Sequence, residues 1–387
     1  MNIELIASTN GLKDSREMIE FGLKCARVCY TNKNWADIQK EPINKQLLNR
    51  LVSSGHHSVF EHMNLTFYFN GMSKALVMLF NNEKQYATSE KSARYTVMSD
   101  IEPEQKKLYD KWMEILIPEI DKIYPETKDF SARKIAVKKL AQENARYMTS
   151  VFTPTKMVHT INLRQLNFLQ QQFERFNKKY RNDDDEFKSR LATEMQDFLS
   201  QTENLRIEGL DNQTDRKLSY FSTIDIPSTE GKDTFTEGKG MYSRIYLLSF
   251  AGLAQAHRHR TISYNVLSGT EKGAKEGFFV PPIVRESGRE SEWIDDLSNV
   301  AEKDFPQAQL LKIYERGRIE DFRSKALLRL CGHAQLEIMR NTLETARGYK
   351  EYIKTYGKNA LKPKCLQGMK CLNNCVWTGK RALERLI

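Results

Sequence analysis

Long apolar runs are absent from this chain. No stretch of its 387 residues approaches the roughly eighteen unbroken apolar residues that a membrane-spanning helix needs, so no membrane partner is expected. The opening residues, MNIELIAST, contain neither a basic leader nor an apolar signal core, which favours a cytoplasmic protein. Hydrophobic residues still make up 40% of the chain, enough for ordinary cores, and the length favours two domains over one.

Paired cysteine motifs are absent as well. The chain has six cysteines: Cys25, Cys29, Cys331, Cys365, Cys371 and Cys375. The last three lie close together, but their gaps of five and three residues form no Cys-x-x-Cys pair, and no fourth ligand is evident. The sequence therefore predicts reduced thiols and no metal, with a zinc site in this tail as the alternative.

A long run of lysine or arginine is the third absence. The chain holds 60 basic and 50 acidic residues, a formal net charge of +10, and has a pI of about 9.1. Such a balance favours polyanionic partners. Without a basic run or a Gly/Arg tail, nucleic acid is a less expected partner than phosphorylated small molecules, which need only local cationic clusters.

Two stretches far apart in the chain share one pattern. NLTFYF (64–69) alternates as a half-buried strand does, and Ser73 can cap the helix that KALVMLF begins. SRIYLLSF (243–250), Ser249 and the helical pattern AGLAQAHRHR repeat this order after a shift of 176 residues. We interpret the pattern as a divergent internal repeat. Two unrelated strand–helix units are the alternative.

Helical patterns lie between the two stretches and after the second. They are expected over about 130–148, 162–176 and 325–354, and a stripe from Leu108 to Ile123 predicts another, with Pro118 as a kink. The polar run 201–215 is typical of a linker. The predicted organisation is a first copy (1–205), a second copy (206–355) and a basic C-terminal extension (356–387).

The segments that follow the two capped helices complement each other. The second copy has Arg-His-Arg (258–260) where the first has Asn-Glu-Lys (82–84). Conversely, the first copy has Glu90 and Arg94 where the second has a valine and a threonine. Each copy lacks what the other keeps. Duplication, followed by loss of one set in each copy, would leave one complete anion-binding site at the internal interface.

These residues resemble the flavin-dependent thymidylate synthases. The hallmark of that family, Arg-His-Arg followed by seven residues and a serine, is met in full by RHRTISYNVLS (258–268). Further segments are similar to the family: GHHSVFEHMNLTF (55–67), SEKSARY (89–95), NARY (144–147), TINLRQLNFL (160–169), FFVP (278–281) and LLRLCGHAQLEI (327–338). The resemblance covers most of 1–175 and 235–355. The first copy departs from it with glutamines at 170–172, where the family has a pyrimidine-contacting arginine, and the second has only DTFTEGK (233–239) for the His-x-Ser-x-Phe-Glu-His segment.

The resemblance implies an α+β fold: two divergent copies of the flavin-dependent thymidylate synthase fold, each an antiparallel sheet with helices, forming a pseudo-dimer. It implies reductive methylation of dUMP to dTMP, with FAD as cofactor and methylenetetrahydrofolate and NADPH as co-substrates. The family uses one copy per chain in a homotetramer, so a homodimer equivalent to that four-fold assembly is expected. The alternatives are a related flavin-dependent pyrimidine-nucleotide modifying enzyme, for example a hydroxymethylating one, and a catalytically inactive relative that binds nucleic acid.

The family pattern also implies a nucleotide site. The expected dUMP contacts are Ser92, Ala93, Arg94, Arg146, Gln255 and Arg258. A phosphate monoester needs convergent donors, which guanidinium groups and loop N–H groups supply. Arg329 is the catalytic candidate, because a guanidinium at the N3/O4 edge of uracil would stabilise the negative charge that makes C5 nucleophilic. A surface arginine on a helix is the alternative.

The FAD contacts that the family implies are Ser58, Glu90, Asn162, Asn167, Arg258, His259 and Arg260, with His57 and Glu61 as further candidates near folate or flavin. A cationic or hydrogen-bonding group near the flavin N1/O2 locus stabilises the reduced anionic ring. Arg258 and Arg260 would lie about 200° apart on a helix, so the triplet divides between ligands or marks a helix end. A solvated helix terminus is the alternative. No cysteine is expected to act as a nucleophile; Cys331 is the one near Arg329.

Overall fold

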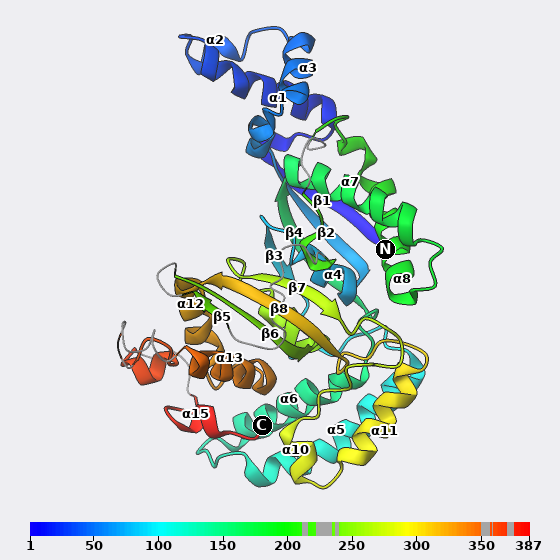
Figure 1. The fold of residues 1–387 in the computed structure, drawn as a ribbon, viewed down its shortest axis with the longest axis vertical. Helices are drawn as coiled ribbons and strands as arrows, with labels where there is room; N and C mark the ends of the chain where they lie inside the picture. Colours follow the sequence, from blue (N-terminus) through cyan, green and yellow to red (C-terminus); the bar gives the residue numbers. More distant parts are fainter. Residues whose placement is uncertain (211–215, 222–233, 237–239, 350–356, 358, 370–374) are drawn as a thin grey trace. The chain divides into compact units, whose positions relative to one another are not determined.

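The chain divides into two compact units, shown in Figure 1. The computed structural model describes residues 1–210, 216–221, 234–236, 240–349, 357, 359–369 and 375–387. The first unit comprises Met1–Lys91 and Pro154–Leu218, and the second comprises Ser92–Thr153 and Ser219–Ile387. The helical stretch 92–153, which we expected in a first copy ending at residue 205, therefore clusters with the second unit. Cys371, most of 233–239 and the end of the linker 201–215 lie outside the described residues.

The first unit is an antiparallel four-stranded sheet covered by helices. Its strands are β1 (Asn2–Ser8), β2 (Asn64–Ser73), β3 (Ala87–Glu90) and β4 (Pro154–Asn162), in the order β1-β2-β4-β3. Its helices are α1 (Ser15–Arg27), α2 (Trp35–Ile38), α3 (Lys45–Ser53), α4 (Lys74–Phe80), α7 (Leu163–Tyr180) and α8 (Glu186–Thr202), with the 3-10 turn η3 (His57–His62). Helices α7 and α8 lie side by side against this sheet (Figure 1).

The alternation in β2 produces the core of this unit. Leu65, Phe67 and Phe69 are buried, as the pattern predicts. Phe80 of α4 packs edge-on against Phe198 of α8, with ring centroids 5.2 Å apart. Apolar burial of this kind is the main favourable contribution to folding.

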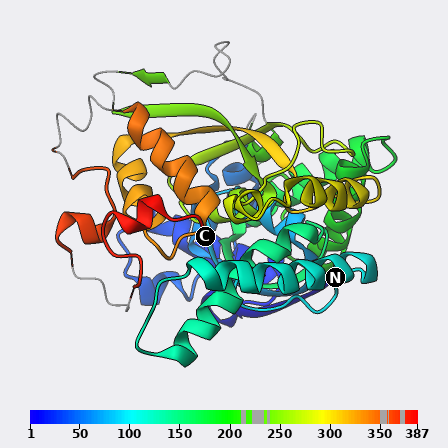
Figure 2. The ribbon, with the colours of Figure 1, turned by 90° about the horizontal axis from the view of Figure 1, so that it is seen from below.

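The second unit contains another antiparallel sheet and two pairs of long helices. Its strands are β5 (Thr234–Thr236), β6 (Met241–Ser249), β7 (Ser263–Ser268) and β8 (Leu310–Arg318), in the order β5-β6-β8-β7. Its helices are α5 (Pro103–Ile123), α6 (Phe130–Ala145), α9 (Phe250–Ala256), α10 (Pro282–Glu286), α11 (Glu290–Ala301), α12 (Ile319–Arg329), α13 (Leu336–Gly348) and α15 (Arg381–Glu384), with the 3-10 turn η4 (Arg146–Met148) after α6. Helices α5 and α6 run next to each other (Figures 1 and 2). The rings of Trp112 in α5 and Trp293 in α11 pack edge to face in the core, with their centroids 4.7 Å apart.

The second sheet repeats the strand order of the first. In each, a serine ends the second strand and caps the next helix: the Ser73 hydroxyl accepts the Leu76 N–H at 3.1 Å, and the Ser249 hydroxyl accepts the Gly252 N–H at 3.0 Å. Both predicted caps are therefore confirmed. A later helix also supplies each serine N–H with a carboxylate, from Glu194 at 2.9 Å and from Glu337 at 2.7 Å. The two antiparallel sheets with their helices confirm the α+β class.

Two predicted helices end earlier than the sequence indicates. The one expected to run through Arg260 stops at Ala256, and the Arg-His-Arg triplet occupies the turn that follows. The long helix expected over 325–354 is broken by the turn Leu330–Gln335 into α12 and α13, and its last residues, 350–354, lie outside the described part of the chain. Gly332 lies in that turn, where a Cβ would stand 2.5 Å from the Trp377 Cβ, so contacts distant in sequence set the break.

Candidate functional site

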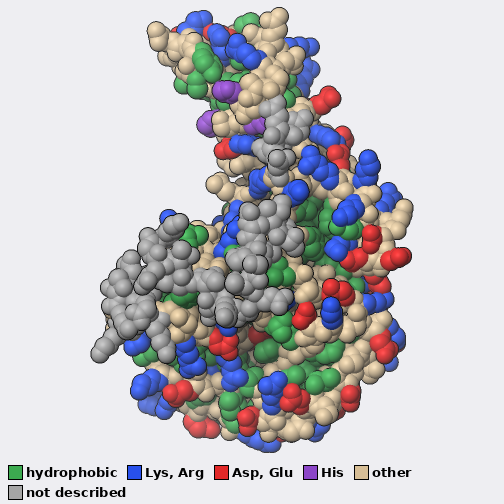
Figure 3. Space-filling view, in the orientation of Figure 1, with side chains coloured by type: hydrophobic (Ala, Val, Ile, Leu, Met, Phe, Trp, Pro, Cys, Tyr) green, Lys and Arg blue, Asp and Glu red, His purple; other side chains and the backbone are tan. Residues whose placement is uncertain are grey.

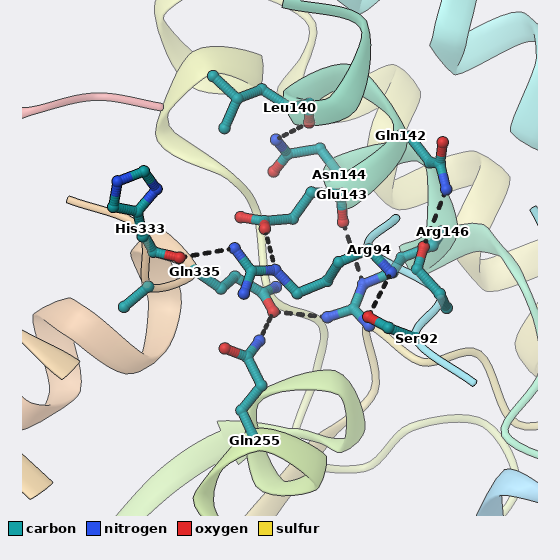
Figure 4. Close-up of polar contacts among 12 residues, drawn as sticks. Ser92, Arg94, Leu140, Gln142, Glu143, Asn144, Arg146, Gln255, His333 and Gln335 are labelled. Carbon is teal, nitrogen blue, oxygen red and sulfur yellow. Dashed lines mark hydrogen bonds and ion pairs between the residues drawn. The ribbon is translucent and has the colours of Figure 1, made fainter. Parts of the chain in front are cut away.

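Arg94 lies in a tight loop at the start of the second unit. The N–H groups of Tyr95 and Thr96 donate to the Ser92 carbonyl at 3.2 Å and 2.9 Å, which fixes this loop. The Arg94 side chain is only 16% exposed; its Nε donates to the Glu143 carboxylate and its Nη2 to the His333 carbonyl at 2.9 Å (Figure 4). Burial alone would lower the pKa of Arg94, but the Glu143 carboxylate outweighs it and raises that pKa.

Arg146 is the most deeply buried of the predicted nucleotide contacts. It lies in η4, directly after α6, and is 5% exposed. Its Nη2 donates to the Gln335 Oε1 at 2.5 Å and its Nε to the Glu143 carbonyl at 3.2 Å (Figure 4). Burial lowers the pKa of Arg146, because removing a guanidinium from water disfavours its charged form.

Gln335 joins three of these side chains. Besides Arg146, its Oε1 accepts a hydrogen bond from the Gln255 Nε2, and its own Nε2 donates to the Tyr147 hydroxyl. Gln255 comes from the end of α9, and its buried Oε1 has no hydrogen-bond partner among the residues that the structure describes. An amide that accepts two donors and donates once is held in one orientation, so Gln335 aligns Arg146 with Gln255.

A buried carboxylate anchors this arrangement. The Tyr147 hydroxyl donates to Glu337 at 2.6 Å, and the Ser249 hydroxyl donates to the same carboxylate at 2.7 Å. Burial raises the pKa of Glu337, and its hydrogen bonds with Tyr147 and Ser249 oppose this. The helix cap of α9 is thus connected through one carboxylate and one tyrosine to the amide that holds Arg146.

Arg329 and His259 form the opposite side of the arrangement. The Arg329 Nε donates to the His259 Nε2 at 2.8 Å, and its Nη2 donates to the Gln255 carbonyl at 3.1 Å. Burial, with the charge of Arg329 next in effect, lowers the pKa of His259 to about 2. Burial, partly offset by Tyr264 and reinforced by the charges of Arg94 and Arg258, lowers the pKa of Arg329 to about 10. His259 is therefore neutral, and the hydrogen bond from Arg329 assigns its proton to Nδ1.

The remaining members of the Arg-His-Arg motif are exposed. Arg258 and Arg260 follow α9 in a turn, on either side of the buried His259. The Ser268 hydroxyl, which completes the motif, donates to Glu276 at 2.5 Å. The triplet therefore marks a helix end, and it presents two cations around one buried neutral imidazole.

The other predicted FAD residues lie in the first unit, and three of them are engaged there. Glu90 pairs with Lys74 at 2.5 Å, Asn162 caps α7 through the Gln165 N–H at 2.8 Å, and Asn167 is buried with its Oδ1 accepting the Ile207 N–H at 2.8 Å. Ser58 is exposed in η3. His57 contacts the Val52 carbonyl through Nε2 at 3.0 Å, and Glu61 pairs with Arg164 at 2.7 Å. These assignments stay predictions.

Glu143, Tyr147, Gln335 and Glu337 belong to the site but were not predicted as site residues. The last two fall inside LLRLCGHAQLEI, so the motif contained their signal. Arg94, Arg146, Arg329 and Gln255 were predicted, and the second unit brings them together. Several guanidinium groups around the carboxylate of Glu143 favour an anionic ligand.

The described part of the chain contains neither a metal-binding cluster nor a membrane-spanning helix. Within it, no group of three or more His, Cys, Asp or Glu side chains could hold a metal ion. Cys25, Cys29, Cys331, Cys365 and Cys375 are free thiols. Across the same residues, no helix has both the length and the apolar character required to span a bilayer.

Solved structures similar to this chain include two nucleotide enzymes. Thymidylate synthase X from Helicobacter pylori, with FAD and dUMP, is 16% identical, covers 54% of this chain and 95% of its own, and has a TM-score of 0.31. A UMP/dUMP methylase from Streptomyces cacaoi, with 5-Br dUMP, is 21% identical, covers 44% and 76%, and has a TM-score of 0.29. Scores at this level do not by themselves establish a shared fold.

Sequence comparison is more specific. The chain is 29% identical over 170 residues to a flavin-dependent thymidylate synthase from Clostridium tetani, covering 36% of this chain and 64% of the relative. It is 24% identical over 148 residues to one from Pyrococcus furiosus, covering 35% and 57%. The chain thus spans less than two thirds of the length of these relatives. The family model described as Thymidylate synthase complementing protein matches residues 5–177 of this chain.

Proposed function

We propose that this chain is a flavin-dependent thymidylate synthase, which methylates dUMP reductively to dTMP with methylenetetrahydrofolate, NADPH and FAD. One observation carries the proposal: the second unit brings Arg94, Arg146 and Arg329 together. Arg146 donates to the Gln335 side chain, which also accepts from Gln255, and Arg329 donates to the Gln255 backbone carbonyl. Arg94 pairs with Glu143, whose backbone carbonyl accepts from Arg146. The resemblance to the family implies nucleotide contacts at these three arginines. The family match over 5–177 supports the same conclusion from an independent direction.

The dUMP phosphate is assigned to Ser92, Ala93, Arg94, Gln255 and Arg258, with Arg146 behind them. Arg94 has N–H donors beyond the two that Glu143 and His333 accept, so it can still bind a phosphate oxygen. Arg258 is exposed and adds a second cation, and its charge acts on Arg329. A guanidinium pair of this kind suits a phosphate dianion.

Arg329 is the proposed catalytic residue. Its Nε is fixed by His259 and its Nη2 by the Gln255 carbonyl, so its remaining donors have a defined direction. Facing the N3/O4 edge of uracil, they would stabilise the charge that accumulates as C5 attacks, without reorganisation during the reaction. Because His259 accepts from Arg329 as a neutral base, it orients this guanidinium and adds no competing charge.

FAD, when bound, would supply the hydride that reduces the transferred carbon. The exposed Arg258 and Arg260 of the second unit fit its pyrophosphate by charge. Ser58 of the first unit is exposed and remains a proposed FAD contact on the resemblance alone. Asn167 fits least well, since backbone groups already occupy its buried amide. Glu90 and Asn162 are likewise engaged within the first unit.

We also propose that the chain arose by duplication, with copies over 1–205 and 206–355, a C-terminal extension (356–387) and one dUMP site per chain. Two features support this: the common strand order of the two sheets, and the serine cap that receives a carboxylate in each. Each chain would then be a pseudo-dimer of its two copies, and two chains would form a homodimer. Sedimentation of the purified protein with dUMP stoichiometry tests both statements, since four chains or two dUMP per chain would contradict them.

The decisive experiment begins with an absorbance spectrum of the purified protein, followed by a dUMP titration and product analysis. Oxidised flavin at about one per chain, with dTMP as product, is expected. Methylene transfer ending in a hydroxymethylated base would identify the rival pyrimidine-modifying activity. Salt-sensitive DNA binding without flavin would instead support the inactive relative. Against it, the basic side chains on the face shown in Figure 3 are interspersed with acidic ones.

A further inference from the structure

A pocket of about 360 Å³ lies inside the second unit, beside the candidate nucleotide site. Helix α6, the loop that carries Arg94 and Tyr95, and the turn with Gly332 and His333 form its walls, together with four residues near the end of the chain: Cys375, Val376, Trp377 and Arg385. Gln255, Arg258 and Arg329 do not line it, so it is distinct from the proposed dUMP site. Arg94 is the cation common to both.

The walls of this pocket suit a planar ring. Ala132, Ala136 and Leu140 follow each other at intervals of four residues and therefore form one row on α6. The small side chains of Ala132 and Ala136 leave room for a ligand against this face of α6. Tyr124 and Trp377 also line the pocket and contact each other edge to face, with ring centroids 5.7 Å apart. Aromatic side chains of this kind bind nucleobases by stacking or edge contact.

Cations outnumber carboxylates around the pocket. Arg94, Lys139 and Arg385 line it, and the one acidic lining residue is Glu143, which already accepts from Arg94. Lys139 is exposed, with its Nζ 5.8 Å from the centre of the Tyr95 ring. The imbalance amounts to about two positive charges.

Arg385 is the most buried of these cations. It is 4% exposed and donates to the Gly332 carbonyl at 2.7 Å and to the Ala334 carbonyl. Among the described residues it forms no direct ion pair, and its Nε is buried without a hydrogen-bond partner. A buried charge without a counter-ion is costly, and a bound anion nearby relieves that cost.

The half-buried His333 reports the same field. Burial, followed by the charges of Arg385 and Arg94, lowers the pKa of its imidazole. Burial is the larger cause, and the smaller contribution from the two guanidinium groups is the one that indicates a positive potential at His333.

We propose that this pocket binds a nucleoside 5′-monophosphate, with the base against Tyr124 and Trp377 and the phosphate near Lys139, Arg94 and Arg385. A phosphate monoester carries about two negative charges near neutral pH, which matches the charge imbalance better than a carboxylate does. The volume is within the range of about 300–1,000 Å³ that is usual for small-ligand pockets. Because both ligands would use Arg94 and repel each other, binding here should weaken dUMP binding at the neighbouring site.

The test measures binding of adenosine 5′-monophosphate to the whole chain by titration calorimetry. Saturable binding at one site per chain is expected, with neither adenosine nor inorganic phosphate alone binding as tightly. Lys139→Gln should weaken it about tenfold, the loss of one charge-assisted contact. Lys138→Gln is the matched control, because Lys138 is an exposed neighbour on α6 that does not line the pocket.

Trp377→Ala should also weaken adenosine monophosphate binding, whereas Arg146→Gln should not. Absence of saturation, or equal loss in Lys139→Gln and Lys138→Gln, would overturn the proposal. This outcome is separable from the fate of the proposed synthase function. If dUMP fails to bind at the Arg146 site but adenosine monophosphate still binds in a Lys139-dependent manner, only the synthase assignment is lost.

Discussion

Gln335 holds the guanidinium of Arg146: its Oε1 accepts the Arg146 Nη2–H at 2.5 Å, across a sequence separation of 189 residues. Arg146 closes the helical stretch 92–153, and Gln335 stands at the N-cap of α13 beside the second sheet. The contact makes these two parts of the chain one site.

Replacing Arg146 by glutamine should therefore remove nucleotide binding more than stability. The shorter neutral side chain cannot reach both Gln335 and the Glu143 carbonyl, and it lacks charge for a phosphate. Since hydrogen bonds to charged groups contribute about 1.5–3 kcal/mol, the dUMP dissociation constant should rise roughly 10- to 100-fold. Titration with dUMP measures it. Arg206→Gln, which breaks a partly exposed pair with Glu174, should leave the constant unchanged.

Removing the Tyr147 hydroxyl tests the anchor behind this contact. Tyr147→Phe leaves the Gln335 Nε2 without its acceptor and Glu337 without one donor, both in the interior. The free energy of unfolding should fall by about 1–3 kcal/mol, and the KM for dUMP should rise because Gln335 is free to turn. Chemical denaturation and steady-state kinetics give the two quantities.

The matched control is Tyr109→Phe. Tyr109 is also buried in the core of this unit, but its hydroxyl has no hydrogen-bond partner within the described part of the chain, and burial raises the pKa of Tyr109 to about 12. Loss of the Tyr109 hydroxyl should leave the free energy of unfolding unchanged or raise it slightly. Equal destabilisation by both substitutions would mean that the Tyr147 network contributes nothing specific.

Local features of this fold could be predicted from the sequence. The alternation in NLTFYF and the caps at Ser73 and Ser249 depend on neighbours within a few residues, and the structure has all three. Arg94 and Arg329 were selected by resemblance to a family, since nothing in their local sequence distinguishes them from surface arginines.

Features that depend on distant packing were missed. The helix over 325–354 looks continuous by periodicity, yet Trp377 and Arg385 hold the turn Leu330–Gln335 from a segment about fifty residues away. Similarly, nothing local indicates that stretch 92–153 clusters with the second unit, so Glu143 was not recognised as the partner of Arg94.

The turn that carries Gln335 should be sensitive to one methyl group. In Gly332→Ala the new Cβ would lie 2.5 Å from the Trp377 Cβ, so backbone or ring must move. A loss of about 1–3 kcal/mol is expected, as for other overpacked sites. Combining Gly332→Ala with Trp377→Ala should relieve the clash, so that the double variant loses less than the sum of the two single ones. Strict additivity in thermal denaturation would contradict this contact.

A buried ion pair near the site gives a separate prediction. Lys325 and Glu315 are both 0% exposed and lie 2.7 Å apart, and the hydroxyl groups of Tyr242 and Tyr246 also donate to Glu315. Lys325→Met should cost about 3–5 kcal/mol, because it leaves a carboxylate buried without its counter-ion. Adding Glu315→Gln removes that charge and keeps an acceptor for the tyrosines, so much of the stability should return. Unfolding curves of the four proteins measure the coupling.

The neutral state of His259 predicts a pH dependence of stability. Its pKa is about 2 in the folded protein, against about 6.5 for an exposed histidine. Between these values the unfolded chain binds a proton that the folded protein does not, so this residue's contribution is complete above about pH 6.5 and is lost as the pH falls. The slope can reach about 1.4 kcal/mol per pH unit. His259→Gln keeps an acceptor for Arg329 but cannot titrate, so its unfolding free energy should fall less steeply between pH 6.5 and 4.5. If the unfolding free energies of the two proteins fall in parallel with pH, or if the His259 imidazole titrates near pH 6.5 by NMR in the folded state, then His259 is not held neutral beside Arg329.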